Sequence, residues 1–232
     1  MDPFRPTHHQ QAENVKSLGN HISIDEFLKK WPAEVLKLCY FERHYSSNID
    51  FSDKVFQQGR RRLLFFYETL HQLEEVAIEN SQIKLVDAYK PEEFIAKFHR
   101  AMSDDFNTAQ ALAELNGLFK FANQVLKKKN EVARNATAFT LSKQIHQIGN
   151  VLGLFQREPM QFILELKQQV LPELGITESE IDKAITARTQ ARNEKNWQES
   201  DAIRDELLSK GIELRDSSQG TQWGIAKQLG DH

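Results

Sequence analysis

The segment that most constrains the fold spans residues 177–223, because it carries start and stop signals for two consecutive helices. Thr177 is followed three residues later by Glu180, and this capping-box pair predicts a helix that begins directly after Thr177. Trp197 opens a second segment whose apolar residues recur at helical spacing. Gly211 ends that segment, since glycine readily takes the backbone conformation that closes a helix. We therefore expect two consecutive helices here.

A β-hairpin is expected directly after these helices. Residues 212–215 alternate between apolar and charged side chains, as a strand with one buried face does. Residues 217–220 have the composition of a turn, and residues 221–223 are predicted to form the returning strand. The C-terminal region is thus predicted to be a small mixed module in an otherwise helical chain.

The side chains of this module suit a ligand with flat rings and phosphates. They include Trp197 and Trp223, guanidinium groups four residues apart at Arg188 and Arg192, and the carboxylates Asp201 and Asp216. Tryptophan and arginine stack on nucleic-acid bases, and aspartate accepts hydrogen bonds from their amino groups. The alternative is structural, because tryptophans often fill small cores and arginines often form solvated faces. The residues alone leave both interpretations open.

Capping residues and apolar periodicity divide the preceding part of the chain into helices. Ser23 and Glu26 form another capping box. Pro32 is expected in the first turn of the next helix, and Ser52 is expected to cap a long helix that ends near Ile78. The regularity of these signals predicts helical bundles rather than sheets.

A corner between two helices is predicted at residues 103–108. Asn107 or Thr108 should cap the second helix, and Phe106 should pack under the turn. Two adjacent carboxylates precede Phe106 and could suggest acid–base or metal chemistry. We assign them to capping, because aspartate is favoured near helix starts.

Charge and cysteine content exclude several classes of protein. The formal net charge of −3 excludes a uniformly basic nucleic-acid binder, so RNA contacts would need local patches. Arg60, Arg61 and Arg62 form one such patch, either as candidate phosphate contacts or as an ordinary solvated face. The single cysteine, Cys39, excludes a disulfide framework and is expected in the core. No apolar run reaches membrane-spanning length, and we expect a cytoplasmic location.

A set of residues at fixed spacing runs through the C-terminal module. Its members are Arg188, Ala191, Arg192, Lys195, Trp197, Asp201, Ile203, Arg204, Asp205, Leu207, Gly211, Ile212, Leu214, Asp216, Gly220, Thr221 and Trp223. This pattern resembles the anticodon-binding end of bacterial cysteinyl-tRNA synthetase. The resemblance implies that Arg192, Asp201 and Asp216 recognise anticodon bases and that Trp197 lies beside them.

Two earlier segments resemble the same family. Residues 13–20 resemble the signature loop with which class I aminoacyl-tRNA synthetases contact ATP, and Lys16 and Ser17 would be its remnant. Glu13 stands where the family has a lysine, and a carboxylate there would repel phosphate, so we expect no catalysis by this loop. Residues 104–108, with the sequence DDFNT, resemble a turn of the family's helical tRNA-binding domain.

The resemblance covers about residues 16–223 and implies a mostly α fold with four parts. These are a disordered start with the degenerate signature loop (1–22), a helical stem-contact region (23–90), a helical-bundle tRNA-binding domain (91–175) and a small mixed anticodon-recognition module (176–232). The expected architecture is therefore helical bundles followed by a small helix-plus-β-hairpin module.

The same resemblance implies a function. The chain is expected to bind tRNA-Cys as the C-terminal part of a truncated or split cysteine–tRNA ligase, with no catalytic residue and no catalysis on its own. The family uses ATP, magnesium and zinc through a nucleotide-binding domain, so no cofactor or metal site is expected in this chain. A separate catalytic-domain chain would be a second partner, and no membrane contact is expected. The alternatives are a free-standing tRNA-binding paralogue and a helical adaptor for protein interactions.

Overall fold

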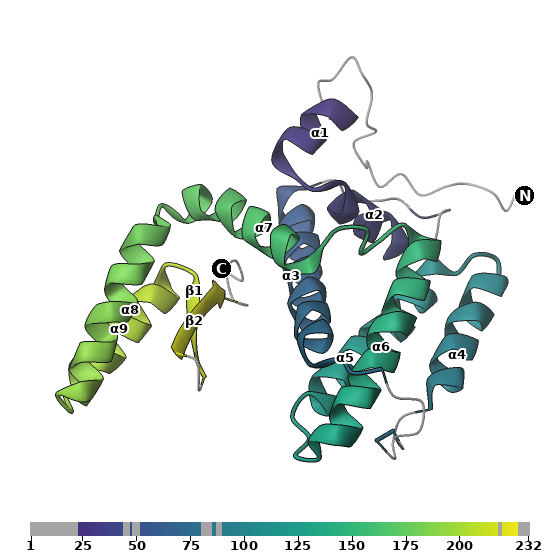
Figure 1. Cartoon of the computed structure of the whole chain (residues 1–232). Coiled ribbons are helices and arrows are strands. Elements are labelled where there is room, and N and C mark those ends of the chain that lie inside the picture. The colour runs from purple at the N-terminus through teal and green to yellow at the C-terminus, as the bar shows by residue number, and fades with distance from the viewer. Residues whose placement is uncertain are drawn as a thin grey trace, which may run out of the picture. The chain divides into compact units, whose positions relative to one another are not determined.

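Figure 1 presents a computed structural model of the chain, which describes residues 23–43, 47, 52–79, 85–86, 90–217 and 220–226. These residues are mainly helical and include a two-stranded sheet near the C-terminus. The mostly α fold with a small terminal hairpin is therefore confirmed. None of the helices in these ranges combines the length and apolar content that crossing a bilayer requires.

The chain divides into two compact units, residues 1–31 and 32–232, and each is described by itself. The first contains helix α1 (Ile24–Lys30). The Oγ of Ser23 accepts a hydrogen bond from the backbone N–H of Glu26 at 3.2 Å, and the Glu26 carboxylate accepts one from the Ser23 N–H at 3.0 Å. This reciprocal pair confirms the predicted capping box. The domain boundaries expected from the sequence stay predictions.

The second unit begins with helices α2 (Ala33–Phe41) and α3 (Asp53–Val76). Pro32 is the N-cap of α2, with ψ near 144°, and so it lies one residue before its expected place in the first turn. Ser52 occupies the N-cap of α3 as expected, and the helix ends two residues before Ile78. Local signals thus place these helices to within one or two residues.

Aromatic side chains of α3 form the centre of the helical core. The rings of Phe66 and Phe119 stack with centroids 4.3 Å apart, and those of Tyr67 and Phe162 stack at 4.1 Å. Phe155 meets three of these rings edge-on. Since Phe119 lies in α5 (Thr108–Val125) and Phe162 in α7 (Pro159–Leu174), α3 holds helices from distant parts of the sequence together.

A buried carboxylate fixes the connection between α6 (Glu131–Leu152) and α7. Glu34 accepts a hydrogen bond from the Tyr67 hydroxyl at 2.9 Å and another from the backbone N–H of Phe155 at 3.0 Å. Burial, together with the charge of Glu34, raises the pKa of Tyr67 far above its ordinary value. The Nζ of Lys37 donates to the carbonyl of Gly153 at 2.6 Å. These bonds anchor the connection that leads into α7.

The corner between α4 (Pro91–Ser103) and α5 partly departs from the prediction. Asn107 caps α5, with its side chain accepting from the Gln110 N–H at 3.0 Å, as expected. The prediction that Phe106 packs under the turn is wrong, because this residue is 70% exposed. Asp105 and Phe106 have φ values of 51° and 52°, a left-handed conformation that helical periodicity does not anticipate.

The C-terminal module contains helices α8 (Glu178–Asn193) and α9 (Trp197–Ser209) and strands β1 (Ile212–Ser217) and β2 (Gly220–Ile225). Thr177 and Glu180 form the predicted capping box. The strands pair antiparallel, with Leu214 opposite Trp223 and Asp216 opposite Thr221. In Figure 1 the hairpin, drawn in yellow, lies beside α8 and α9. The predicted two helices and hairpin are confirmed.

Candidate nucleic-acid interface

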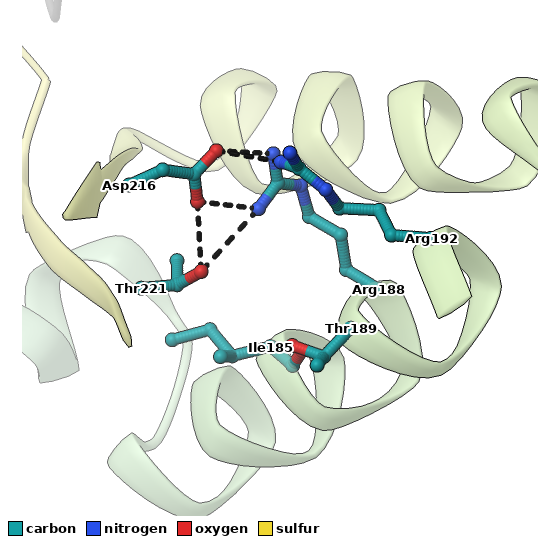
Figure 2. Close-up of polar contacts among 6 residues, drawn as sticks. All are labelled: Ile185, Arg188, Thr189, Arg192, Asp216 and Thr221. Carbon is teal, nitrogen blue, oxygen red and sulfur yellow. Dashed lines mark hydrogen bonds and ion pairs between the residues drawn. The ribbon is translucent and has the colours of Figure 1, made fainter. Parts of the chain in front are cut away.

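Arginine side chains of α8 meet the strand ends of the hairpin in one polar cluster. Arg188 and Arg192 lie one helical turn apart and therefore project from the same face of α8. Asp216 near the end of β1 faces Thr221 on β2 because of the hairpin register. Figure 2 shows both guanidinium groups and the threonine hydroxyl converging on the Asp216 carboxylate. We call these four residues the Asp216 cluster.

Both oxygens of Asp216 accept two hydrogen bonds each. Oδ1 accepts from Nη1 of Arg188 at 2.8 Å and from Oγ1 of Thr221 at 2.7 Å. Oδ2 accepts from Nη2 of Arg188 at 2.9 Å and from Nη1 of Arg192 at 2.7 Å. An ionised carboxylate has about four acceptor positions, so these four donors fill them.

The two arginines differ sharply in solvent exposure. The side chain of Arg188 is 5% exposed, whereas those of Arg192 and Asp216 are 43% and 44% exposed. Hydrogen bonds from Arg188 and then Thr221 hold the pKa of Asp216 well below its ordinary value, and Arg192 lowers it further. The hydrogen bond to Asp216 in turn raises the pKa of Arg188. Asp216 and Arg188 are therefore both ionised at neutral pH.

Trp197 and Asp201 lie one turn apart on the first half of α9. Both are exposed, and the indole of Trp197 presents a large apolar surface because the residue is 58% exposed. Besides the dominant hydrogen bond from Arg188 to Asp216, the charge of Asp201 contributes to the raised pKa of Arg188. The structure thus brings Arg192 and Asp216 into contact, and Asp201 acts on the same cluster through its charge.

Lys195 at the α8–α9 corner has φ of 59°, an uncommon left-handed conformation for a lysine. The neighbouring Asn196 caps α9, and its side chain accepts from the Glu199 N–H at 3.3 Å. This tight corner starts α9 at Trp197 and leaves the indole at the surface.

Trp223 differs from Trp197 in its surroundings. Its carbonyl accepts a hydrogen bond from Nζ of Lys167 at 2.7 Å, and the same ammonium group lies 4.5 Å from the centre of its ring. Burial lowers the pKa of Lys167. Beside it, Nη1 of Arg215 donates to Glu68 at 2.9 Å. Trp223 is half-buried and joins the hairpin to α7.

The arginine run of α3 is engaged by carboxylates. Arg60 is 6% exposed and donates from Nη1 and Nη2 to the two oxygens of Glu173, at 2.9 and 2.5 Å. Arg62 forms an ion pair with Glu42. A phosphate would have to displace Glu173 to reach Arg60. Phosphate contact by Arg60, Arg61 and Arg62 stays a prediction.

The remaining predicted site residues, Lys16 and Ser17, lie outside the described residues. In the part of the chain that the structure describes, no three His, Cys, Asp or Glu residues are grouped to hold a metal ion. Cys39 is buried, and burial raises its pKa to about 11, so its thiol is protonated at neutral pH. The prediction that Cys39 is a core residue is confirmed.

The sequence pattern does not place Thr221 among the site residues, and it assigns no separate role to Arg188. The spacing of Arg188 and Arg192 showed that they share a face, but not which of them is buried. A two-residue turn after Ser217 would have placed Thr221 opposite Asp216, and this was the available signal.

Two protein families match parts of the chain. Residues 97–156 match the DALR domain, and residues 177–223 match the cysteinyl-tRNA ligase anticodon binding domain. The Asp216 cluster, Trp197 and Asp201 all lie within the second match. The part of the molecule that carries the site is thus similar to the anticodon binding domain of cysteinyl-tRNA ligases.

Curated relatives extend this similarity to most of the chain. The cysteine–tRNA ligase of Geobacter metallireducens is 39% identical over 216 residues, which are 90% of this chain and 44% of the relative. The enzymes of Geobacter sulfurreducens and of an Anaeromyxobacter species are 38% and 34% identical, with 90% of this chain and 44% and 43% of the relatives covered. The chain is therefore similar to cysteine–tRNA ligases over most of its own length, and it spans less than half the length of those it matches.

Proposed function

We propose that this chain binds tRNA-Cys and that its C-terminal module recognises the anticodon. The match to an anticodon binding domain supports tRNA as the partner, and the proposal adds which tRNA and which residues. The recognising groups would be Arg192, Trp197, Asp201 and Asp216. The observation that carries the proposal is the combination of an exposed indole with exposed guanidinium and carboxylate groups on one small module.

Each group suits one part of an unpaired nucleotide. The Trp197 indole offers a face on which a base can stack. Asp201 and Asp216 can accept hydrogen bonds from amino groups of bases, and Arg192 can donate to base acceptors or to phosphate. Because the chain as a whole carries a net charge of −3, such local contacts would dominate over general attraction to phosphate.

We also propose that the chain acts as the tRNA-binding part of a truncated or split cysteine–tRNA ligase and does not aminoacylate tRNA alone. ATP, magnesium and zinc would be bound by a catalytic domain on a separate chain. Aminoacylation by this chain alone, above the rate without protein, would contradict this proposal. Restored aminoacylation on adding a separate catalytic domain would support it. A cytoplasmic location and the absence of membrane contacts stay predictions.

The first experiment measures the binding of a tRNA-Cys transcript and of an unrelated tRNA to the full chain. We expect tighter binding of tRNA-Cys, and Arg192→Ala should weaken it by roughly 1–3 kcal/mol. Lys183→Ala is the matched control, since Lys183 is an exposed cation on the opposite face of α8. Equal affinity for both tRNAs would indicate phosphate contacts alone and would contradict anticodon recognition.

One observation favours a second function. Arg192 and Asp216 bind each other in the structure, as they would in a helical adaptor that has no RNA ligand. An adaptor predicts no tRNA binding at all, whereas a free-standing tRNA-binding paralogue predicts binding without any partnership with a catalytic domain. The binding experiment and the reconstitution experiment therefore separate the three functions.

A further inference from the structure

The acceptor positions of Asp216 are filled before any ligand arrives. Arg188 supplies two donors, and Thr221 and Arg192 supply one each. A carboxylate in this state cannot accept another strong hydrogen bond unless one donor leaves. If Asp216 recognises a base, binding must therefore involve an exchange of partners on this carboxylate.

The structure indicates which donor is free to leave. Arg188 is 5% exposed and makes a bidentate pair, so its departure would leave a buried charge uncompensated. Thr221 is held opposite Asp216 by the hairpin register. Arg192 makes one hydrogen bond to Asp216 and is 43% exposed, and such ion pairs are weakly held because water competes for both charges.

We propose that Arg192 is an exchangeable cover on Asp216 and that Arg188 is the positioning residue that keeps the carboxylate in place during the exchange. An amino group of an unpaired base replaces Arg192 at Oδ2 of Asp216. The released guanidinium then donates to a nearby phosphate. This inference rests on the proposed function and adds the chemical class of the ligand, a base edge that carries an amino donor.

The burial of Arg188 supports a role in positioning. Its Nε has no hydrogen-bond partner among the described residues although it is buried, and unsatisfied buried donors are rare in folded proteins. Burying a guanidinium with an unsatisfied donor costs folding free energy, and an apolar side chain could hold the hairpin without that cost. The bidentate geometry, in contrast, fixes both the rotation and the charge of the carboxylate.

The test uses the full chain and anticodon stem-loop RNAs of tRNA-Cys in which each anticodon base is changed in turn. Asp216→Asn should remove discrimination at one position, and that position is the one the carboxylate recognises. Arg188→Lys keeps the charge but cannot make the bidentate pair. We expect it to reduce discrimination at that same position by about tenfold, with the salt dependence of binding unchanged because Arg188 is buried. Full discrimination in Arg188→Lys would overturn the positioning role.

Arg192→Ala tests the exchange without disturbing the buried pair. If Arg192 only covers Asp216, this variant should bind all the stem-loops about tenfold more weakly and with a shallower salt dependence, yet retain discrimination at the Asp216 position. Loss of that discrimination would overturn the exchange, since the two residues would then recognise the base as a pair. This outcome can be scored even if Arg188→Lys fails to fold.

A second measurement follows the pair in the free protein. Without RNA, the changes in melting temperature caused by Arg192→Ala and Asp216→Asn should not sum to the change in the double variant, because the two residues form a pair. With saturating stem-loop the two changes should sum, because the exchange breaks the pair. Non-additivity that persists in the complex would overturn the exchange. Failure of the wild-type chain to bind any stem-loop would instead contradict the proposed function, so the two failures are distinguishable.

Discussion

Two buried arginines, Arg60 in α3 and Arg188 in α8, use the same chemistry in different surroundings. Each side chain is less than 10% exposed, and each donates two hydrogen bonds to a carboxylate from a distant segment. Arg60 joins α3 to Glu173 in α7, between two long helices of the helical body. Arg188 holds Asp216 in a small hairpin, and the exposed Arg192 binds the same carboxylate. The exposed Trp197 follows five residues after Arg192 in the sequence.

The difference lies in what surrounds the carboxylate rather than in the pair itself. Beside Asp216, a further cation and a hydroxyl fill the acceptor positions from the solvent side. We therefore interpret the Arg60 pair as a structural brace and, under the proposed function, the Arg188 pair as a preorganised recognition group.

The largest effect is expected from Arg60→Ala. This change leaves Glu173 without its bidentate partner, and we expect the free energy of unfolding to fall by about 2–3 kcal/mol. The loss should be smaller than for a fully buried pair, because Glu173 is 35% exposed. Urea unfolding followed by circular dichroism measures it, with Lys54→Ala, at an exposed position of α3, as the control within about 0.5 kcal/mol.

The same variant also tests the arginine run as a phosphate contact. As a brace, Arg60 should contribute nothing to RNA affinity per folded molecule. Unchanged stability together with weaker tRNA binding would reverse the assignment and make Arg60 the ligand contact.

The second largest effect is expected on RNA binding, from replacing Trp197. Trp197→Ala should weaken binding of the tRNA-Cys stem-loop by about 1–3 kcal/mol, since stacking of one base on an aromatic ring is worth this much. Stability should change little because the residue is 58% exposed. Leu208→Ala, at a 49% exposed apolar position of the same helix, is the control. An equal loss of binding in both variants would argue against stacking on Trp197.

Signals that act over a few residues were recovered from the sequence. The capping boxes at Ser23 and Thr177, the Asn107 cap and the terminal hairpin all depend on residues close together in the chain. Phe106 was placed wrongly because its left-handed backbone leaves the helical pattern on which its expected packing was based.

Contacts between distant segments could not be predicted. Glu173 lies 113 residues from Arg60, and nothing in the local pattern distinguishes Arg60 from Arg61 and Arg62, which are less buried. In the Asp216 cluster, the residue types and the shared face of α8 followed from spacing. The burial of Arg188 did not, because it depends on how the hairpin folds back onto the helix.

The pH dependence of stability should distinguish the Asp216 cluster as well. The folded-state pKa of Asp216 is lowered, chiefly by its hydrogen bonds from Arg188 and Thr221. Its contribution is therefore fully present above the unfolded pKa of about 4 and is lost as the pH falls below that value. Wild type should exceed Asp216→Asn in stability by at most about 1 kcal/mol at pH 7, because the side chain is 44% exposed and solvent screens it.

This difference between wild type and Asp216→Asn should shrink steadily below about pH 4. Thermal unfolding at a series of pH values measures it, and an Arg188→Gln background is the matched control, in which the pH dependence should be weaker. A difference that grows on acidification would show that the carboxylate destabilises the module.

The smallest effect is expected from a third arginine–carboxylate pair, Arg215 with Glu68. Here the arginine side chain is 43% exposed and the glutamate 17% exposed, which reverses the burial order of the Asp216 cluster. Because water already solvates the arginine, Arg215→Ala should lower the free energy of unfolding by only about 0.5–1 kcal/mol, less in high salt. Urea unfolding at low and high ionic strength measures it. A loss as large as that of Arg60→Ala would mean that burial of the arginine does not decide which pairs act as braces.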